Sequence, residues 1–423
     1  MPFTLILPSP RARSTVDYRA FLSPNRLQGT PSMSDARQIS LPDASHESLI
    51  IDSIDRFLER DVRPYIRALE DSDTWPKDIV DRMKGLGLFG ATISPDYGGL
   101  GLSASTYARI VERVSAVWMS IAGIFNAHLI MAAAIERFGT KEQKLTFLPR
   151  CASGELRGAI ALTEPDCGTD LQGIRTRTHI YRDRYIVNGS KLWVSNGVHG
   201  NILVALVKTD PDMDPPHRGM SLLIIEKNAP GLEVARKLEK LGYKGIDTGE
   251  IVFDDCEVPR ENLIGGIEGR GMQQILSGLE LGRINVAARG CGIARACLEE
   301  SLAYARTRKT FGRPICEHQS IQIKLAEMST RLEASRLLTE SAALAYDAKE
   351  RCDMEAGMAK LFATETALFN ATEAMRIHGA YGYSKEFNIE RYYRDAPLLA
   401  IAEGTNEMQR MIIAKQLVKR HPA

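Results

Sequence analysis

The sequence lacks the features of proteins that bind nucleic acids or cross membranes. Its 54 basic and 53 acidic residues among 423 give a formal net charge of +1, whereas binding to nucleic acid or to an anionic membrane needs a basic excess. No uninterrupted apolar run approaches the roughly 18 residues of a membrane-spanning helix. Hydrophobic residues make up 44% of the chain, which is typical of globular proteins with a large core. We therefore expect a soluble protein that has no membrane span and binds no nucleic acid.

Cysteine is scarce and shows no pairing pattern. The seven cysteines are an odd number, are widely spaced and include no Cys-x-x-Cys pair. This distribution disfavours a disulfide framework and favours a reducing intracellular compartment. The eight histidines show neither the His-Glu-x-x-His pattern nor a Cys/His zinc spacing. We predict no metal site.

Residues 1–44 differ in composition from the rest of the chain. Up to Met33 the segment is rich in arginine, serine and proline and carries one acidic residue, Asp17. This composition fits a transit peptide, a disordered leader, or an upstream start that precedes a true start at Met33. A transit peptide predicts the mitochondrial matrix, whereas the other two interpretations predict a cytoplasmic bacterial protein.

The remaining sequence divides into three regions by hydrophobic periodicity. Residues 45–156 repeat apolar side chains at helical spacing, residues 157–266 contain short β-branched runs separated by turn residues, and residues 267–423 are helical again. The sequence therefore predicts an α+β multidomain protein. We expect an N-terminal helical domain, a middle β-barrel or sandwich domain, and a C-terminal four-helix bundle.

Local signals place several elements within these regions. Thr140 to Gln143 has the pattern of a capping box at a helix start. Asn188-Gly189 is the dipeptide most typical of a two-residue hairpin. Strands are expected over residues 178–181, 185–187, 202–207, 221–226 and 251–253, and long C-terminal helices over about 272–307, 315–349, 354–378 and 405–419.

Three segments gather residues that suit either a cofactor or ordinary structure. Residues 161–170 leave a strand and place Thr163 and Thr169 in a polar turn, where hydroxyls can donate to a ring heteroatom or phosphate or simply form the turn. In residues 191–197, Trp193 is either a core aromatic or a flat wall for a planar cofactor. Residues 305–312 gather cations at a helix end, where they suit the helix dipole or clamp a phosphate.

The most informative segment spans residues 401–410 and contains Glu403-Gly404-Thr405. A carboxylate at a helix start often only complements the helix dipole. The alternative is a catalytic base on a short apolar lead-in, residues 398–402, where burial would raise its pKa towards the working range. In that case the adjacent Gly404 amide could polarise a carbonyl oxygen.

Taken together and in order, these segments resemble those of the acyl-CoA dehydrogenases. The resemblance runs from about residue 45 to 420 and rests on five segments. They are Tyr97-Gly98-Gly99, Thr163-Glu164-Pro165 with Gly168-Thr169-Asp170, Trp193-Val194-Ser195-Asn196-Gly197, Arg308-Lys309-Thr310-Phe311-Gly312 and Glu403-Gly404-Thr405-Asn406-Glu407. Each segment alone is weak, but five in register are specific to the family.

The resemblance implies an FAD-dependent oxidoreductase that converts an acyl-CoA thioester to its 2,3-enoyl form. In this family a base at the position of Glu403 takes the α-proton while the β-carbon delivers a hydride to flavin N5. The resemblance also implies an electron-transfer flavoprotein or a similar acceptor as redox partner. It further implies a homo-oligomer, most often a tetramer, because residues of one subunit reach the FAD of its neighbour.

The resemblance also assigns roles to other residues of this sequence. The position of Glu403 is catalytic, and four positions contact substrate: Thr169, Glu280, Arg283 and Gly404. The positions that bind FAD are Ile160, Leu162, Thr163, Thr169, Trp193, Val194, Ser195, Arg308, Thr310, Phe311, His318, Gln319, Arg376, Gly379, Ala380, Thr405 and Glu407.

The sequence departs from the family pattern at a few of these positions. Arg376 stands where a glutamine is usual, and Ala380 replaces the second glycine of a pair. Some relatives carry the base immediately before the position of Arg283, where this chain has Gly282, so Glu403 remains the candidate base. Relatives that act on dicarboxylyl-CoA place an arginine near the acyl tail; residues 117–120 correspond to that place and lack one, which favours an uncharged acyl group.

Two other function classes stay open on the sequence. An acyl-CoA oxidase or flavin monooxygenase would share the fold, and the sequence does not show whether the reduced flavin reacts with oxygen. A non-catalytic relative that binds DNA or a protein partner is the third alternative, although the near-zero net charge disfavours DNA binding.

Overall fold

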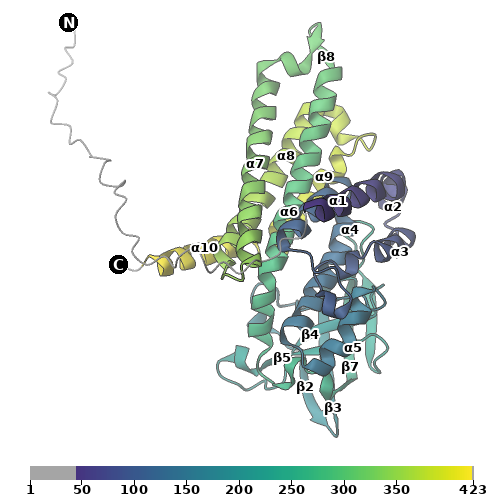
Figure 1. Cartoon of the computed structure of the whole chain (residues 1–423), viewed down its shortest axis with the longest axis vertical. Helices are drawn as coiled ribbons and strands as arrows, with labels where there is room; N and C mark the ends of the chain where they lie inside the picture. The colour runs from purple at the N-terminus through teal and green to yellow at the C-terminus, as the bar shows by residue number, and fades with distance from the viewer. Residues whose placement is uncertain (1–43, 422–423) are drawn as a thin grey trace, which may run out of the picture. The chain divides into compact units, whose positions relative to one another are not determined.

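The computed structural model describes residues 44–421 (Figure 1). From Ser48 onward they belong to one compact unit. The predicted leader, with its alternative start at Met33, lies outside the described residues except for Ala44, where the first helix begins.

The first part of the described chain is helical. Its helices are α1 (Ala44–Phe57), α2 (Ile66–Asp71), α3 (Lys77–Gly85), α4 (Ala104–Phe138) and α5 (Lys141–Ala152). The predicted capping box is confirmed, since the Thr140 hydroxyl accepts from the Gln143 amide and the Gln143 side chain accepts from the Thr140 amide. Helix α4 is kinked at Trp118, where φ of −156° and ψ of 104° leave the helical region.

Among the described residues, α4 is the one helix whose length and composition would suit a membrane span. However, 83% of its apolar window is buried inside the protein, where it packs against α5, the C-terminal helix α6 and strand β1. Burial of this kind is that of a core helix.

The middle region forms a curled sheet of seven strands. They are β1 (Gly158–Ala161), β2 (Arg177–Tyr181), β3 (Arg184–Ser195), β4 (Ile202–Lys208), β5 (Met220–Glu226), β6 (Leu232–Lys237) and β7 (Thr248–Pro259). Strand β4 pairs with β5 in antiparallel fashion and with β1 in parallel, and the order then continues through β2, β3 and β7 to β6. The five predicted strands are confirmed, whereas β6 was not predicted.

The predicted hairpin at Asn188-Gly189 is wrong. The β2–β3 turn lies at Arg182 and Asp183, with Arg182 at a φ of 57°. Asn188 and Gly189 instead lie inside β3, at an irregularity in its pairing with β7. A Cβ at Gly189 would stand 2.6 Å from the Thr176 hydroxyl oxygen. The glycine therefore permits a close approach between chain segments rather than a turn.

The last region is helical, as predicted. It comprises α6 (Gly271–Thr307), α7 (Gln319–Asp347), α8 (Asp353–His378), α9 (Ile389–Ile401) and α10 (Asn406–Arg420). Helices α6, α7 and α8 run side by side, and the short hairpin β8 (Lys309–Thr310) and β9 (Arg313–Pro314) joins α6 to α7 at their far end (Figure 1). Helix α9 was missed because only its last residues were treated as an apolar lead-in; it also contains Pro397, which ordinarily disfavours a helix interior.

Small side chains let α8 lie close to its neighbours. One face of α8 carries fully buried alanines at intervals of three or four residues: Ala356, Ala359, Ala363, Ala367, Ala371 and Ala374. Opposite them, a Cβ at Gly290 of α6 would stand 2.7 Å from the Ala363 carbonyl oxygen. This close packing fixes α6 and α8 relative to each other, and both helices contribute residues to the site described next.

Candidate active site

Glu403 lies in the short connection between α9 and α10. Its φ of 54° and the φ of 86° at Gly404 place two successive residues in the left-handed region, which is costly for a residue with a side chain. The connection ends at Thr405, whose hydroxyl caps α10 by accepting from the Met408 amide at 3.3 Å. This tight turn directs the Glu403 side chain towards α4 and α6.

The two carboxylate oxygens of Glu403 have different surroundings. Oε1 accepts a hydrogen bond from Asn126 Nδ2 of α4 at 3.1 Å and an ion-paired one from Arg289 Nη2 of α6 at 3.2 Å. Oε2 is buried and has no hydrogen-bond partner among the described residues. A methyl group at Gly282 of α6 would overlap with this oxygen, so the missing side chain at Gly282 makes room for it.

A buried polar network continues from Glu403 into the protein. The Tyr107 hydroxyl donates to Asn126 Oδ1 at 3.2 Å and accepts from Asn285 Nδ2 at 2.9 Å. On the other side, Arg289 Nη1 donates to the Tyr243 hydroxyl at 3.1 Å. Burial raises the pKa of Tyr107 and that of Tyr243, so both phenols stay neutral. We name these five residues and Glu403 the Glu403 network.

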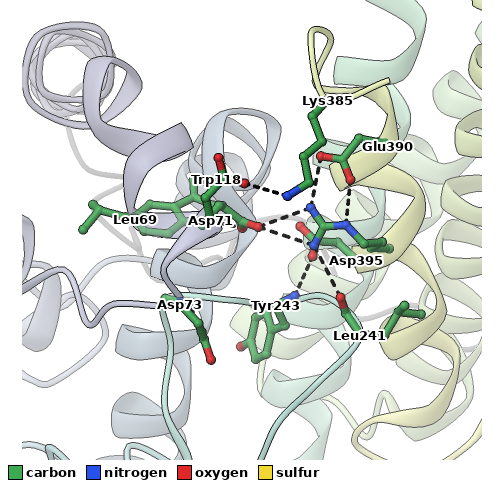
Figure 2. A network of polar contacts seen from close by, with 12 residues as sticks. Leu69, Asp71, Asp73, Trp118, Leu241, Tyr243, Lys385, Glu390 and Asp395 are labelled. Carbon is green, nitrogen blue, oxygen red and sulfur yellow. Dashed lines mark hydrogen bonds and ion pairs between the residues drawn. The ribbon is translucent and has the colours of Figure 1, made fainter. Parts of the chain in front are cut away.

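Tyr243 enters this network from the loop between β6 and β7. Its hydroxyl occupies the space where a Cβ at Gly123 of α4 would stand. Its backbone amide donates to Asp395 Oδ1 of α9 at 2.6 Å. Figure 2 shows Tyr243 beside Asp395 at the edge of a second polar cluster, which includes Trp118.

Lys360 of α8 holds the connection that carries Glu403. Its fully buried ammonium group donates to the carbonyl oxygens of Ala400 at 3.2 Å and Gly404 at 3.0 Å, and to Asn406 Oδ1 at 2.8 Å. Burial lowers the pKa of Lys360 to about 8, although nearby carboxylates oppose this. The three bonds span Glu403 on both sides and stabilise its left-handed backbone.

The predicted flavin-wall segments lie together at the end of β1. The Leu192 amide donates to the Thr163 carbonyl oxygen at 2.8 Å, which joins residues 161–170 to residues 191–197. Beneath them Lys191 and Glu164 form a buried ion pair at 2.7 Å. Although burial opposes ionisation, Lys191 and the backbone amides of Arg175 and Thr176 hold the pKa of Glu164 below its usual range.

Above the buried Lys191–Glu164 ion pair, polar and aromatic side chains point outward. Trp193, at a φ of 63°, is 56% exposed, so it is not the core aromatic of the alternative interpretation. The side-chain hydroxyls of Thr163, Thr169 and Ser195 make no hydrogen bond to any described residue. Of the other predicted positions here, Ile160 and Leu162 are half-buried and Val194 is buried.

The predicted FAD-binding positions between residues 308 and 319 form a separate group at the β8–β9 hairpin. Thr310 Oγ1 lies 3.0 Å from His318 Nε2, and the Phe311 ring packs edge-on against the His318 ring although it is 95% exposed. Arg308 and Gln319 are exposed beside them. Helix α6 separates this hairpin from the sheet by its 37 residues, about 55 Å at the usual helical rise. One chain therefore does not bring the hairpin and the Trp193 segment to a common site.

The remaining predicted positions lie on the helices around α8 and α6. Arg376 is exposed and pairs with Glu373 at 2.6 Å, while Gly379 has a φ of 62° and Ala380 is exposed. Glu407 is exposed in the first turn of α10. On α6, Glu280 is half-buried, and Arg283 is buried with no hydrogen-bond partner for its Nε among the described residues. Burial raises the pKa of Glu280 and lowers that of Arg283.

Sequence reasoning missed the residues that surround Glu403. Asn126, Arg289 and Tyr243 are far apart in the chain and match none of the five segments. One signal was available for Arg289: it stands alone as a charge in an otherwise apolar run of α6 and follows Gly282 by seven residues, or two helical turns. Trp118, which had been weighed as part of an acyl pocket, is fully buried and donates to Glu70 Oε1 at 2.8 Å.

Comparison with known proteins now decides the family. The chain matches the N-terminal acyl-CoA dehydrogenase domain over residues 44–155, the middle domain over 159–256 and the C-terminal domain over 269–418. The chain belongs to the acyl-CoA dehydrogenase family. The predictions of family, fold class and enzyme type are thereby confirmed; the family as a whole is flavin-dependent and typically tetrameric.

Individual acyl-CoA dehydrogenase relatives agree over nearly their whole length. The chain is 40% identical to an acyl-CoA dehydrogenase of Bacillus subtilis (strain 168), over 86% of this chain and 95% of the relative. It is 37% identical to an acryloyl-CoA reductase (NADH) of Anaerotignum propionicum, over 86% of this chain and 92% of the relative. The structure of butyryl-CoA dehydrogenase from Megasphaera elsdenii matches with a TM-score of 0.86 and 34% identity, covering 90% of this chain and 100% of that one.

Proposed function

We propose that this acyl-CoA dehydrogenase oxidises an acyl-CoA thioester to the 2,3-enoyl-CoA, with Glu403 as the base that removes the α-proton. The single observation that carries the proposal is the state of Glu403 Oε2, which is buried and has no partner, while Oε1 is held by two donors. A carboxylate oxygen in such a place has lost its water and has its lone pairs free. That is the condition in which it takes a proton from carbon most readily.

The chain's own residues also support the acidification of the α-carbon. The α C–H of a thioester is a weak acid and needs hydrogen bonds to the carbonyl oxygen as negative charge develops there. Gly404 follows the base directly, and its carbonyl, not its amide, is bound by Lys360 and by Gln409 Nε2 at 3.0 Å. We assign the Gly404 amide, which donates to no described residue, as one donor to the thioester oxygen.

The residues at the end of β1 fit FAD as cofactor. The hydroxyls of Thr163, Thr169 and Ser195 make no hydrogen bond to any described residue, and they lie beside the outward-facing Trp193 indole. We propose that Ile160, Leu162 and Val194 complete this wall. When bound, the flavin supplies the oxidant for the β-hydrogen. The protein's part is to orient the acyl chain between this wall and Glu403 and to exclude water.

A second copy of the chain would complete the cofactor site. Arg308, Thr310, Phe311, His318 and Gln319 lie at the hairpin, too distant along α6 to reach the wall of their own chain. We propose that they reach the FAD of a neighbouring subunit, and that Arg376, Gly379, Ala380, Thr405 and Glu407 provide further contacts to it. This arrangement predicts a homo-oligomer, a tetramer by analogy with the family, which light scattering of the purified protein measures. We propose an electron-transfer flavoprotein or similar acceptor as redox partner.

For the acyl substrate we propose contacts from Thr169, Glu280, Arg283 and Gly404. Arg283 is buried with an unpartnered Nε, and Glu280 lies almost one helical turn before it on α6. Trp118 and its neighbours are buried in the protein core and belong to another network. They therefore give no information on acyl charge, and a panel of straight, branched and dicarboxylyl thioesters is needed to define the acyl group.

The test of the base is Glu403→Gln, read by anaerobic bleaching of the flavin absorbance on mixing with acyl-CoA. The amide keeps the shape of the side chain but cannot accept the proton, so we expect flavin and acyl-CoA to bind and bleaching to slow by at least about 1,000-fold. Glu233→Gln, on the exposed face of β6, is the control and should bleach at the wild-type rate. Bleaching of Glu403→Gln at the wild-type rate would assign the base to another residue.

A further inference from the structure

The two oxygens of the Glu403 carboxylate differ in their hydrogen bonds. Asn126 and Arg289 both donate to Oε1, and no described residue donates to Oε2. The donors come from two different helices, α4 and α6, and both side chains are buried, with 3% of each residue exposed. Two rigid donors on one oxygen fix the carboxylate plane, and with it the direction of the other oxygen.

We propose that Asn126 and Arg289 are positioning residues that select Oε2 of Glu403 as the proton-accepting oxygen. The proposal rests on the proposed function, which names Glu403 as base but does not distinguish its oxygens. Neither residue belongs to the family segments on which the site was predicted. Gly282 supports the same assignment, because its missing side chain leaves space beside Oε2 and not beside Oε1.

The step can be written for this oxygen. The α C–H bond breaks and its proton goes to Oε2, while the electron pair of that bond forms the Cα–Cβ double bond. The β-hydrogen would leave with its electron pair to the oxidant, a role that a bound flavin would supply. Glu403 becomes a neutral acid, and Oε1 remains bound to Asn126 and Arg289 throughout, so the carboxyl group does not rotate during the transfer.

Cations and neutral phenols surround the Glu403 carboxylate. The charged and titratable groups that act on it are Arg283 and Arg289 of α6, Lys360 of α8, Tyr107 of α4 and Tyr243 of the β6–β7 loop. Both phenols are neutral, and of the three cations only Arg289 touches the carboxylate. Removing Arg289 should therefore displace the Glu403 carboxylate, whereas Arg283 and Lys360 do not hold it directly.

The test compares Arg289→Gln, Arg289→Lys and Asn126→Ala with Arg295→Gln as matched control. Arg295 lies on the same helix, and its ion pair with Glu299 faces solvent. Stopped-flow flavin bleaching is recorded without oxygen at pH 7, with the acyl-CoA of the panel that bleaches the wild-type flavin fastest. Acyl-CoA affinity is measured separately by calorimetry with the corresponding enoyl-CoA product, and folding by thermal unfolding. Wild-type bleaching must be seen first, because its absence with every acyl-CoA of the panel would refute the proposed function and this inference with it.

We expect Arg289→Gln to bleach about 10- to 100-fold more slowly at pH 7, with acyl-CoA affinity within about 2-fold of wild type. Arg289→Lys should restore only part of the rate, since one ammonium keeps the charge but cannot reproduce the planar contact. Asn126→Ala should slow bleaching about 10-fold, because Arg289 still holds Oε1. Arg295→Gln should match wild type.

Two results would overturn the proposal. The first is a wild-type bleaching rate in Arg289→Gln. The second is a loss of rate in Arg289→Gln that is matched by an equal loss of acyl-CoA affinity and is not partly restored in Arg289→Lys, which would make Arg289 a substrate contact or a purely structural group. If Arg289→Gln does not fold, Asn126→Ala decides: an unchanged bleaching rate in that variant contradicts the proposal.

Discussion

Two glutamates with arginine partners can be compared in this protein. Glu403 belongs to the network described above, and Glu70 belongs to a second cluster with Trp118, Arg394 and Asp395, which we name the Glu70 network. Figure 2 shows Trp118 and Asp395 of this cluster. Glu70 is buried, Glu403 is half-buried with its Oε2 buried, and Tyr243 links the networks through its hydroxyl and its amide.

The networks differ in whether both oxygens of the glutamate carboxylate have hydrogen-bond partners. Both oxygens of Glu70 have partners: Trp118 Nε1 donates to Oε1 at 2.8 Å, and Arg394 lies 3.5 Å from Oε2. Arg394 is in turn bound by Glu390 and by the Leu241 carbonyl oxygen. In the Glu403 network, by contrast, Glu403 Oε2, Arg289 Nε and Asn285 Oδ1 are buried without partners. A satisfied polar cluster specifies structure, whereas unsatisfied buried atoms mark a place where a ligand is expected.

The largest expected effect that separates the networks is on turnover, from Gly282→Ala. A methyl group there would overlap with Glu403 Oε2 and would displace the carboxylate from its reactive position. We expect acyl-CoA oxidation to fall about 100-fold, and the free energy of unfolding to fall as well, because the displaced carboxylate loses its bonds from Asn126 and Arg289. Gly278→Ala, one turn earlier on α6 with open space at its Cβ, is the control for the helical effect. Equal activity of the two variants would contradict the assignment.

The next effect is on stability, from Glu70→Gln. An amide cannot accept from both Trp118 and Arg394, so one buried group is left unsatisfied, at a cost of about 1–3 kcal/mol of unfolding free energy. The rate of acyl-CoA oxidation per folded protein should stay at the wild-type value. Urea unfolding at pH 7 together with a steady-state assay measures both. A large loss of rate at full stability would show that the Glu70 network also acts in catalysis.

A third effect is on the pH dependence of stability, from Asp395→Asn. Burial, with a contribution from the charge of Glu70, raises the pKa of Asp395 to about 7. Between the ordinary value near 4 and pH 7 the folded state thus holds a proton that the unfolded state has lost. Wild-type stability therefore falls as the pH rises through that window. The variant keeps an acceptor for the Tyr243 amide and should lack this decline in a series of urea midpoints from pH 4 to 8.

Asp71→Asn gives the opposite sign and serves as control for that series. Lys385, at 3.0 Å, holds the pKa of the exposed Asp71 carboxyl below its usual range. Its contribution is present at neutral pH and is lost as the pH falls through the folded value, and because the pair is exposed it is small. A difference from wild type of the same sign in both variants would contradict the assignment to Asp395.

The sequence predicts what short-range patterns control. The capping box at Thr140, five strands of the sheet and four long C-terminal helices follow from local spacing, and they were found as expected. The hairpin prediction at Asn188-Gly189 was wrong because a glycine can be required either by a turn or by a close approach of two chain segments. Only the neighbouring Thr176 distinguishes these two cases. Helix α9 was missed because a proline inside a helix contradicts local propensity and is tolerated through tertiary packing.

For the site, the family segments pointed to Glu403 but not to its surroundings. Arg289, Asn126 and Tyr243 meet there only because α4, α6 and the β6–β7 loop pack together, and no local pattern encodes that meeting. Lys360 is a similar case, since a lysine in a helix usually indicates a solvated face and here it is fully buried beneath the Glu403 turn. Which residues surround the base is thus set by long-range packing.

The Tyr243 hydroxyl fills the space where a side chain at Gly123 would begin. Substitutions at the two positions are therefore coupled, although 119 residues of sequence lie between them. A lineage that gains a side chain on α4 at this point must first, or at the same time, replace the tyrosine, and with it the partner of Arg289. We expect aligned homologues to show these two sites changing as a pair.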